Sequence, residues 1–269
     1  MYPFELHIDL LGVSLNLGPY GLFLGLALTT AVVVRVILGT RVGYPWKKQL
    51  LLLSLMGVFA LLGARLFFAL GNWATYAADP VQFLAWSSSG FSLYGGFLFA
   101  GITALIGAWI LQWSPTHLSD TWIPVSGLSI ALVRIGCFLH GCCFGVETDL
   151  PWGVTFPFTS PAHLYQLEHG GSLFSVHAVH PTELYEGASA LVLALLLLTM
   201  PKTLLPRGTD LRTALFLGVF SFARLLIGFV RAQTDSAPVW MYPLIYIVVL
   251  FLSIIWGLRH YGVYSKHTP

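Results

Sequence analysis

The sequence predicts an all-α integral membrane protein with seven transmembrane helices and a folded cap on the outer side of the membrane. Of its 269 residues, 57% are hydrophobic and only 9% are charged, whereas a soluble domain carries about 25% charged residues. The apolar residues gather in seven stretches, and the intervening loops differ sharply in basic charge. This composition excludes an ordinary soluble domain. We also expect no nucleic-acid partner, because the sequence has no matching basic patch.

Each of the seven stretches is long enough, or nearly so, to cross a hydrocarbon core about 30 Å thick. They cover approximately residues 18–38, 49–70, 91–113, 121–139, 186–201, 211–231 and 240–258. The fifth is short, so we expect its helix to begin earlier, near Leu184. Together the stretches predict a single transmembrane domain over residues 1–269, which includes the outer cap at residues 140–183.

Basic residues distinguish the two sides of the membrane. Lysines and arginines occur in the 39–48 loop, in the 202–212 loop and in the C-terminal tail. The N-terminal segment, the 71–90 loop and the 140–183 segment contain none. Because cytoplasmic loops are enriched in Lys and Arg, we expect the N-terminus outside and the C-terminus in the cytoplasm. An odd number of spans agrees with that orientation.

Arginines stand inside or at the edges of these apolar stretches, where lipid offers their guanidinium groups no partner. Inserting one at a helix centre costs roughly 2.5–3.5 kcal/mol. Four of them, Arg65, Arg134, Arg224 and Arg231, are the ones that we single out. We expect such side chains to face a polar cavity that holds an anion, and a phospholipid headgroup is the most abundant anion in a membrane. For any single arginine the alternative is an ion pair between helices, for which Glu183 and Glu186 supply acids.

A second group of reactive side chains follows Arg134, at the end of the fourth span. Residues 133–145 read V-R-I-G-C-F-L-H-G-C-C-F-G. They contain Gly136, Gly141, Gly145, Cys137, Cys142, Cys143 and His140. On a helix, Arg134, Cys137 and Gly141 share one face. A phosphate held by Arg134 is therefore expected to lie close to the Cys137 thiol.

The residues leave four interpretations of the Cys/His cluster open. One thiolate, activated by Arg134, can act as a nucleophile. Sulfur and imidazole ligands can bind a soft metal such as zinc or Cu(I), although the spacing matches no common zinc motif. Two cysteines can form a redox pair at the oxidising outer face. Lastly, small cysteines can simply pack against glycines at a tight helix end.

These motifs resemble those of the bacterial prolipoprotein diacylglyceryl transferases, whose fourth membrane helix carries the signature G-R-x-G-N-F-x-N-x-E-x-x-G. Arg134, Gly136, Phe138 and Gly145 fit that pattern, while Val133 replaces its first glycine. The resemblance extends along most of the chain. It includes P-Y-G-L (19–22), Y-G-G (94–96), S-D-T-W-I-P (119–124), W-G-V-T-F-P (152–157), H-P-T-E-L-Y-E (180–186) and F-A-R-L-L-I-G-F-V-R (222–231).

The resemblance implies a transferase of the bacterial inner membrane with a periplasmic cap. The family moves the diacylglyceryl group of phosphatidylglycerol to the cysteine thiol of a lipoprotein precursor and releases glycerol 1-phosphate. For this chain we expect the acceptor to be a thiol or another nucleophile. No cofactor or metal is implied, and we expect a monomer. The matching positions give the substrate-binding candidates Arg134, Arg224, Arg231, Gly136, Gly141, Gly145, Tyr20, Gly95 and Gly96.

The chain departs from the family pattern where thiol chemistry is expected. Cys137 and His140 replace asparagines, Cys142 replaces a glutamate, and Tyr94 replaces a histidine. Phe220 and Gly228 likewise replace a tyrosine and a glutamate. This pattern indicates a divergent paralogue with an intact phosphate site and an altered acceptor site. The catalytic candidates are Arg134, Arg224, Tyr94, Cys137, His140 and Cys142. The alternative function is a non-catalytic or transport-like membrane protein that handles metal or thiol redox chemistry through the Cys/His cluster.

Overall fold

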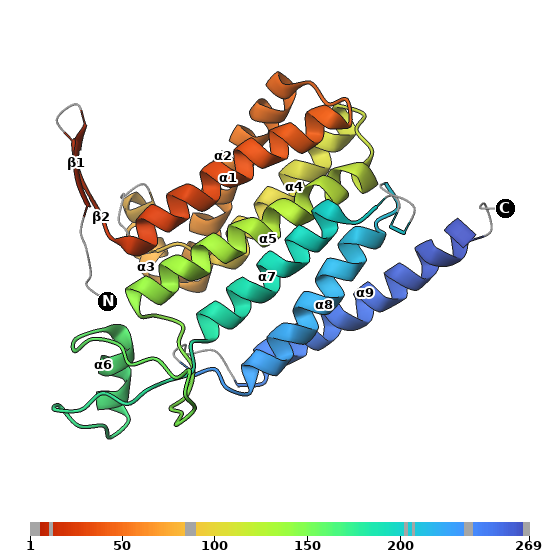
Figure 1. Cartoon of the computed structure of the whole chain (residues 1–269). Coiled ribbons are helices and arrows are strands. Elements are labelled where there is room, and N and C mark those ends of the chain that lie inside the picture. The colour runs from red at the N-terminus through yellow and green to blue at the C-terminus, as the bar shows by residue number, and fades with distance from the viewer. Residues whose placement is uncertain are drawn as a thin grey trace. The chain divides into compact units, whose positions relative to one another are not determined.

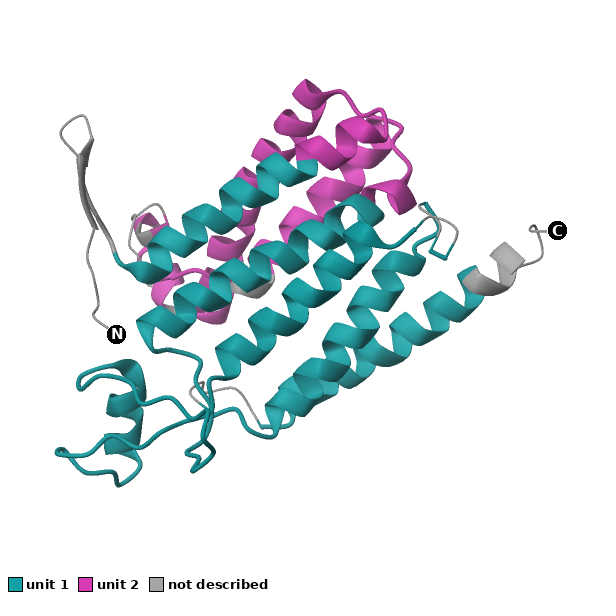
Figure 2. Cartoon of the chain, in the orientation of Figure 1, with its two compact units in different colours: residues 1–35, 119–269 teal, residues 36–118 magenta. Residues whose placement is uncertain are grey.

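The computed structural model describes residues 6–10, 13–83, 90–201, 204–205, 208–233 and 239–265. The chain divides into two compact units (Figure 2). Unit 1 comprises residues 1–35 and 119–269, and unit 2 comprises residues 36–118. The expectation of one domain over the whole chain stays a prediction.

A helix occupies each of the seven predicted spans (Figure 1). The long helices are α1 (Pro19–Arg41), α2 (Trp46–Gly71), α4 (Leu93–Ile110), α5 (Pro115–His140), α7 (Thr182–Thr199), α8 (Leu211–Gly228) and α9 (Met241–Ser265). Six of these, all except α4, are long and apolar enough to cross a membrane. The apolar part of α4 is shorter and covers Gly95–Ile110. The predicted all-α membrane fold is confirmed, and the fifth span does begin early, at Thr182.

The remaining elements are short. A β-hairpin, β1 (Leu6–Leu10) and β2 (Val13–Leu17), precedes α1 with Leu6 opposite Leu17, and the sequence did not predict it. Helix α3 (Trp73–Ala78) and the 3₁₀ turn η1 (Pro80–Phe83) follow α2. Helix α6 (Pro161–Glu168) lies in the segment between α5 and α7.

Small residues let the helices of unit 1 pack closely. A Cβ atom on Gly136 of α5 would lie 2.8 Å from Phe23 Cβ of α1. One on Gly127 would lie 2.7 Å from the Ala190 carbonyl oxygen of α7. Close approach through small side chains is typical of membrane helices, where packing replaces the hydrophobic effect. The sequence therefore places α1 and α7 against α5, the helix that carries Arg134.

The segment between α5 and α7 folds into a compact region that we call the cap, and its place on the outer side of the membrane stays a prediction. Its α6 begins at Ser160, whose hydroxyl accepts a hydrogen bond from the His163 amide at 3.2 Å, an ordinary N-cap. Gln166 of α6 exchanges two hydrogen bonds with the backbone of His177, at 3.0 and 3.2 Å. The buried core of the cap consists of Phe144, Phe156, Ala162, Val179 and Ala232.

Three chain segments meet at the base of the cap. The Gly145 amide donates to the His180 carbonyl at 2.8 Å, and the Val146 amide donates to the Val230 carbonyl at 2.9 Å. A Cβ atom on Gly145 would lie 2.5 Å from His180 Cβ, so only glycine fits there. These contacts join the end of α5 to the start of α7 and to the chain that follows α8.

Glycines also bring α2 and α4 of unit 2 together. A Cβ atom on Gly95 would lie 2.6 Å from Phe67 Cβ, and one on Gly63 would lie 2.6 Å from the Gly95 carbonyl oxygen. Arg65 of α2 donates to the carbonyls of Phe83 and Gly90, at 3.2 and 3.1 Å. Its guanidinium also stands 5.6 Å from the centre of the Tyr76 ring. These contacts fit a structural role for Arg65.

Arg212, a basic residue of the predicted cytoplasmic loop, is fully buried. Its guanidinium donates to the carbonyls of Leu197, Met200 and Leu205. The carbonyls at a helix C-terminus have no partner within the helix, and a cation there is favourable. Arg212 therefore caps the end of α7.

Candidate active site

Three arginines of unit 1 converge on a single carboxylate, Glu186 of α7. Its Oε2 lies 2.6 Å from Nε of Arg134, which comes from α5. Its Oε1 lies 2.7 Å from Nη1 of Arg231, just beyond α8, and also pairs with Nη1 of Arg224 within α8. The Glu186 side chain is only 1% exposed, against 21% for Arg134 and Arg231. We call these four residues the arginine cluster.

Arg224 is held from a further helix. Its Nε and Nη2 both donate to the hydroxyl of Tyr246 in α9, at 3.0 and 2.8 Å. The guanidinium also stands 5.0 Å from the centre of the Tyr246 ring, within range of a cation–π interaction. Arg224 is thus oriented by α7 and α9 together.

The arginine cluster carries excess positive charge. Three guanidinium groups face one carboxylate, so two positive charges are not neutralised within it. Guanidinium groups bind phosphate through paired, charge-assisted hydrogen bonds. Because Arg134 and Arg231 are the more exposed members, they are the ones that an incoming anion can reach.

The three thiols gather beside this cluster. The Sγ atoms of Cys137, Cys142 and Cys143, which we call the thiol cluster, all lie within 4.8 Å of one another. None of the three is in a disulfide; Cys137 is buried and the other two are half-buried. Nη1 of Arg134 lies 3.9 Å from Cys137 Sγ, so the expected proximity of Arg134 to this thiol is present.

The two thiols beyond the end of α5 have opposite tendencies to ionise. Hydrogen bonds from the Cys137 and Cys142 thiols lower the pKa of Cys143 well below its usual range, and the charges of Arg231 and Arg134 act in the same direction. Hydrogen bonds with the Cys137 and Cys143 thiols, together with burial, raise the pKa of Cys142. Cys143 is therefore the thiol best placed to ionise, which its position in the sequence did not indicate.

A second carboxyl group, Glu183, is completely buried one turn before Glu186. Neither of its oxygens accepts a hydrogen bond from another residue in the described part of the chain. It is close enough to Cys143, Arg231 and Arg134 to interact electrostatically with each of them, and it also interacts with its own backbone amide. A buried carboxyl group without a partner is unusual and costs free energy. Such groups are common in active sites.

The matches with known proteins agree with these motifs. A model of the prolipoprotein diacylglyceryl transferase family matches residues 8–260. The chain belongs to the prolipoprotein diacylglyceryl transferase family.

Several curated relatives carry the name phosphatidylglycerol–prolipoprotein diacylglyceryl transferase. One from Clostridium perfringens, numbered 2, is 25% identical over 220 residues, which cover 81% of this chain and 80% of the relative. One from a Synechococcus strain is 28% identical over 188 residues, covering 68% and 64%. One from a Nostoc strain is 29% identical over 234 residues, covering 83% and 79%. These names favour the transferase over the alternative of a metal- or redox-handling transport-like protein.

The structure brings together most of the residues that the resemblance to prolipoprotein diacylglyceryl transferases suggested in unit 1. Arg134, Arg224 and Arg231 share one carboxylate. The Tyr20 and His140 rings lie near each other, with centroids 6.4 Å apart, and His140 is exposed. The three glycines have roles in the backbone. Gly136 packs on α1, and Gly141 has a left-handed backbone at the end of α5 (φ 79°). Gly145 lies where the three chain segments meet at the base of the cap.

Three candidates lie in unit 2 instead. Tyr94, Gly95 and Gly96 form the first turns of α4, and the side chain of Tyr94 lies outside the described residues. Gly95 packs tightly against α2, and this close contact explains why a glycine stands at that position. A role for these three residues in binding substrate stays a prediction.

Reasoning from the sequence missed two features of the site. Glu183 and Glu186 were named only as acids for the alternative of an ion pair with a single arginine, whereas Glu186 joins three arginines. Tyr246 was not singled out, although a hydroxyl within the apolar stretch of α9 is a signal that could have indicated it. Phe220, which replaces a family tyrosine, stacks on Phe216 with ring centroids 5.5 Å apart and so belongs to the apolar packing of α8.

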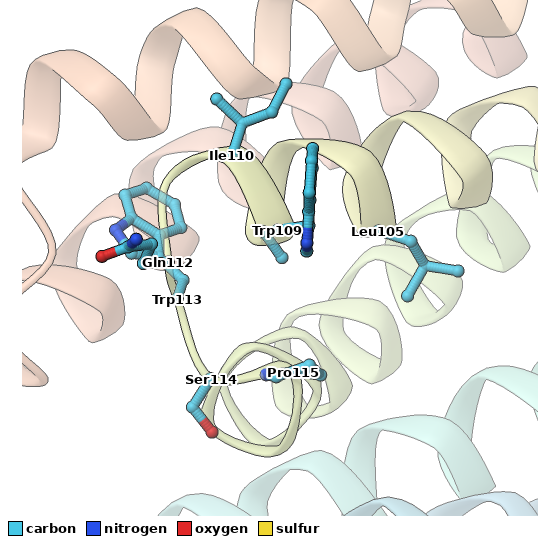
Figure 3. Close-up of a pocket in the computed structure, with 8 residues that line it drawn as sticks. Leu105, Trp109, Ile110, Gln112, Trp113, Ser114 and Pro115 are labelled. Atoms are coloured by element: carbon cyan, nitrogen blue, oxygen red, sulfur yellow. The ribbon is translucent and has the colours of Figure 1, made fainter.

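A separate pocket of about 800 Å³ lies in unit 2, at the turn that follows α4 (Figure 3). Its lining includes Leu105, Trp109, Gln112 and Trp113. It contains no charged residue and none of the candidate site residues. Nothing in its lining matches the chemistry of an anionic substrate.

Proposed function

We propose that this chain binds phosphatidylglycerol through its phosphate and transfers the diacylglyceryl group to a thiol. The observation that carries the proposal is the arginine cluster, in which two positive charges remain beyond the one that Glu186 neutralises. The names of the relatives point to phosphatidylglycerol as the lipid, and the excess positive charge gives a physical reason for an anionic substrate.

In the proposed reaction a thiolate attacks the glyceryl carbon that is bonded to the phosphate oxygen. A carbon–sulfur bond forms, the carbon–oxygen bond breaks, and glycerol phosphate leaves with the electron pair. Negative charge grows on the leaving phosphate, where the Arg134 and Arg231 guanidinium groups can stabilise it. Because Glu186 and Tyr246 already orient the arginines, little reorganisation is needed when that charge develops.

The acceptor thiol must also lose its proton. Tyr94 replaces the family's histidine, so the proposal needs another proton acceptor, and we assign that role to Glu183. Its buried carboxyl accepts no hydrogen bond from another described residue and interacts electrostatically with both Cys143 and Arg134. The proton that Glu183 takes from the thiol can return to the leaving phosphate monoester, so the reaction has no net need for another reactant.

The site is expected to face the outer side of the membrane. It lies where α5 ends, where α7 begins and where α8 ends, next to the cap. The distribution of basic residues assigns those ends to the outer side, with the N-terminus outside and the C-terminus in the cytoplasm. The protein is proposed to act as a monomer in the bacterial inner membrane.

The test uses the purified full-length protein in mixed micelles that contain phosphatidylglycerol. The acceptor is a peptide that carries the cysteine-containing segment of a lipoprotein precursor. Mass spectrometry measures the diacylglyceryl adduct on the peptide, and an enzymatic assay measures glycerol phosphate. We expect both products in equal amounts. They should be lost in Arg134→Ala, and the exposed-arginine control Arg41→Ala should keep them.

Two results would contradict the proposal. One is full activity in Arg134→Ala, which would remove the arginine cluster from the reaction. The other is the absence of both products with folded wild-type protein across several thiol acceptors. Release of glycerol phosphate without an adduct would show that water, not a thiol, is the acceptor.

A further inference from the structure

The thiol cluster has a geometry that neither phosphate binding nor proton transfer requires. Helix α5 ends at His140, and the amides of Gly141 and Cys142 both donate to the Cys137 carbonyl, at 2.9 and 3.1 Å. Gly141 and Cys143 then adopt left-handed backbone conformations, with φ of 79° and 68°. That conformation is uncommon for a residue other than glycine. The result is a tight reversal that brings Cys142 and Cys143 back to Cys137.

The spacing of the three sulfurs suits one small soft ion. With all three Sγ atoms within 4.8 Å of one another, the centre of the triangle is at most about 2.8 Å from each sulfur, against roughly 2.3 Å for a metal–thiolate bond. Each sulfur therefore has to move inward by only about 0.5 Å to reach bonding distance. Rotation about a Cα–Cβ bond can supply such a movement.

The donor set and its surroundings select the kind of ion. Three sulfurs suit soft ions such as Cu(I), whereas hard ions such as Mg²⁺ and Ca²⁺ need oxygen ligands. A structural zinc site takes four ligands, and the group found in the described residues contains three. A monovalent ion with three thiolates carries two negative charges. The arginine cluster next to it carries two uncompensated positive charges, with Arg134 only 3.9 Å from Cys137.

We propose that the thiol cluster binds one soft monovalent metal ion of the Cu(I) class, next to the phosphate-binding arginines. Cys137, Cys142 and Cys143 provide its three ligands, and Arg134 and Arg231 balance the charge of the complex. Cys142 and Cys143 are half-buried, so the ion has access from the surface. The binding does not require the transfer reaction, although it uses the two positive charges that the proposed function assigns to the phosphate.

The test titrates the reduced full-length protein with Cu(I) in detergent and without oxygen, against a chromophoric Cu(I) chelator. A thiol assay first verifies three free thiols per chain. We expect one ion per chain, and X-ray absorption should find three sulfur neighbours. Since removal of a group that merely orients a ligand lowers metal affinity about 10- to 100-fold, loss of any one sulfur should lower it at least about 100-fold.

The variants Cys137→Ser, Cys142→Ser and Cys143→Ser test each ligand, and circular dichroism and gel filtration verify their folding. The matched control is His140→Ala, which removes the nearby exposed imidazole and should leave the Cu(I) affinity unchanged. Two results overturn the proposal. One is a fully reduced protein that does not compete with the chelator. The other is binding of several ions, or of an ion that requires His140.

Discussion

The replacement of Glu186 by glutamine tests the centre of the candidate site. Glu186 is 1% exposed, and it lies 2.6 Å from Arg134 and 2.7 Å from Arg231 while also pairing with Arg224. Glutamine keeps the shape of the side chain but removes the charge that three guanidinium groups share. The variant therefore leaves three like charges close together in a mostly buried site.

The expected loss of stability follows from this arrangement. Removing one partner of a buried ion pair costs about 3–5 kcal/mol. Arg134 and Arg231 are 21% exposed and can regain some hydration, so we place the loss near the middle of that range, at about 4 kcal/mol. For a chain of this size each kcal/mol lowers Tm by about 2–4 °C, which predicts a fall of about 10 °C.

The assay is thermal unfolding in mild detergent, followed by circular dichroism. The matched control is Glu168→Gln in α6, where the carboxylate is exposed, and it should change Tm by no more than about 2 °C. A second variant, Glu186→Asp, keeps the charge and should fall between the two. If Glu186→Gln unfolds at the wild-type temperature, the three arginines do not depend on this carboxylate, and the account of the cluster is wrong.

Four further outcomes are expected. Reporter fusions should place Lys47 in the cytoplasm and His169 outside, and the opposite result would reverse the proposed orientation. Arg134→Lys should retain only part of the transferase activity, because an ammonium group cannot donate two parallel hydrogen bonds to a phosphate as a guanidinium does. A fully active variant would argue against a contact between Arg134 and the phosphate. Glu183→Gln should lower the transfer rate about 10²- to 10⁴-fold in a folded protein, as expected for loss of a general base, and an unchanged rate would exclude the role. In the metal-free wild type, Cys143 should be alkylated faster than the other two cysteines, because its lowered pKa leaves a larger fraction of it as thiolate at a given pH; peptide mapping that finds equal, slow labelling would contradict this.

The sequence was sufficient for the membrane fold because apolar length and basic loops report directly on a bilayer. Both signals are local, and each predicted span contains a helix. The hairpin at Leu6–Leu10 and Val13–Leu17 was not predicted. Its two strands contain only ten residues, and the seven long apolar stretches dominate the hydrophobic pattern of the sequence.

The candidate site could be predicted only in part. The cost of placing arginines in lipid singled out Arg134, Arg224 and Arg231, and the structure brings them together. Their common partner could not be deduced, because Glu183 and Glu186 lie one turn apart and either could have been the acid. Which of the two faces the arginines depends on how α7 is rotated against α5 and α8, and this is a property of tertiary packing.

The sharing of Glu186 has a consequence for how the protein is made. Arg134, Glu186 and Arg224 belong to α5, α7 and α8, so no single helix can neutralise its own charge as it enters the bilayer. An unpaired charged residue weakens insertion of an isolated segment. Helices α7 and α8 follow each other along the chain and carry opposite charges at their common end, so they are suited to enter the bilayer as a pair. Arg134 then finds its counter-charge only when α5 packs against that pair, so the site is complete only after three separate helices have come together.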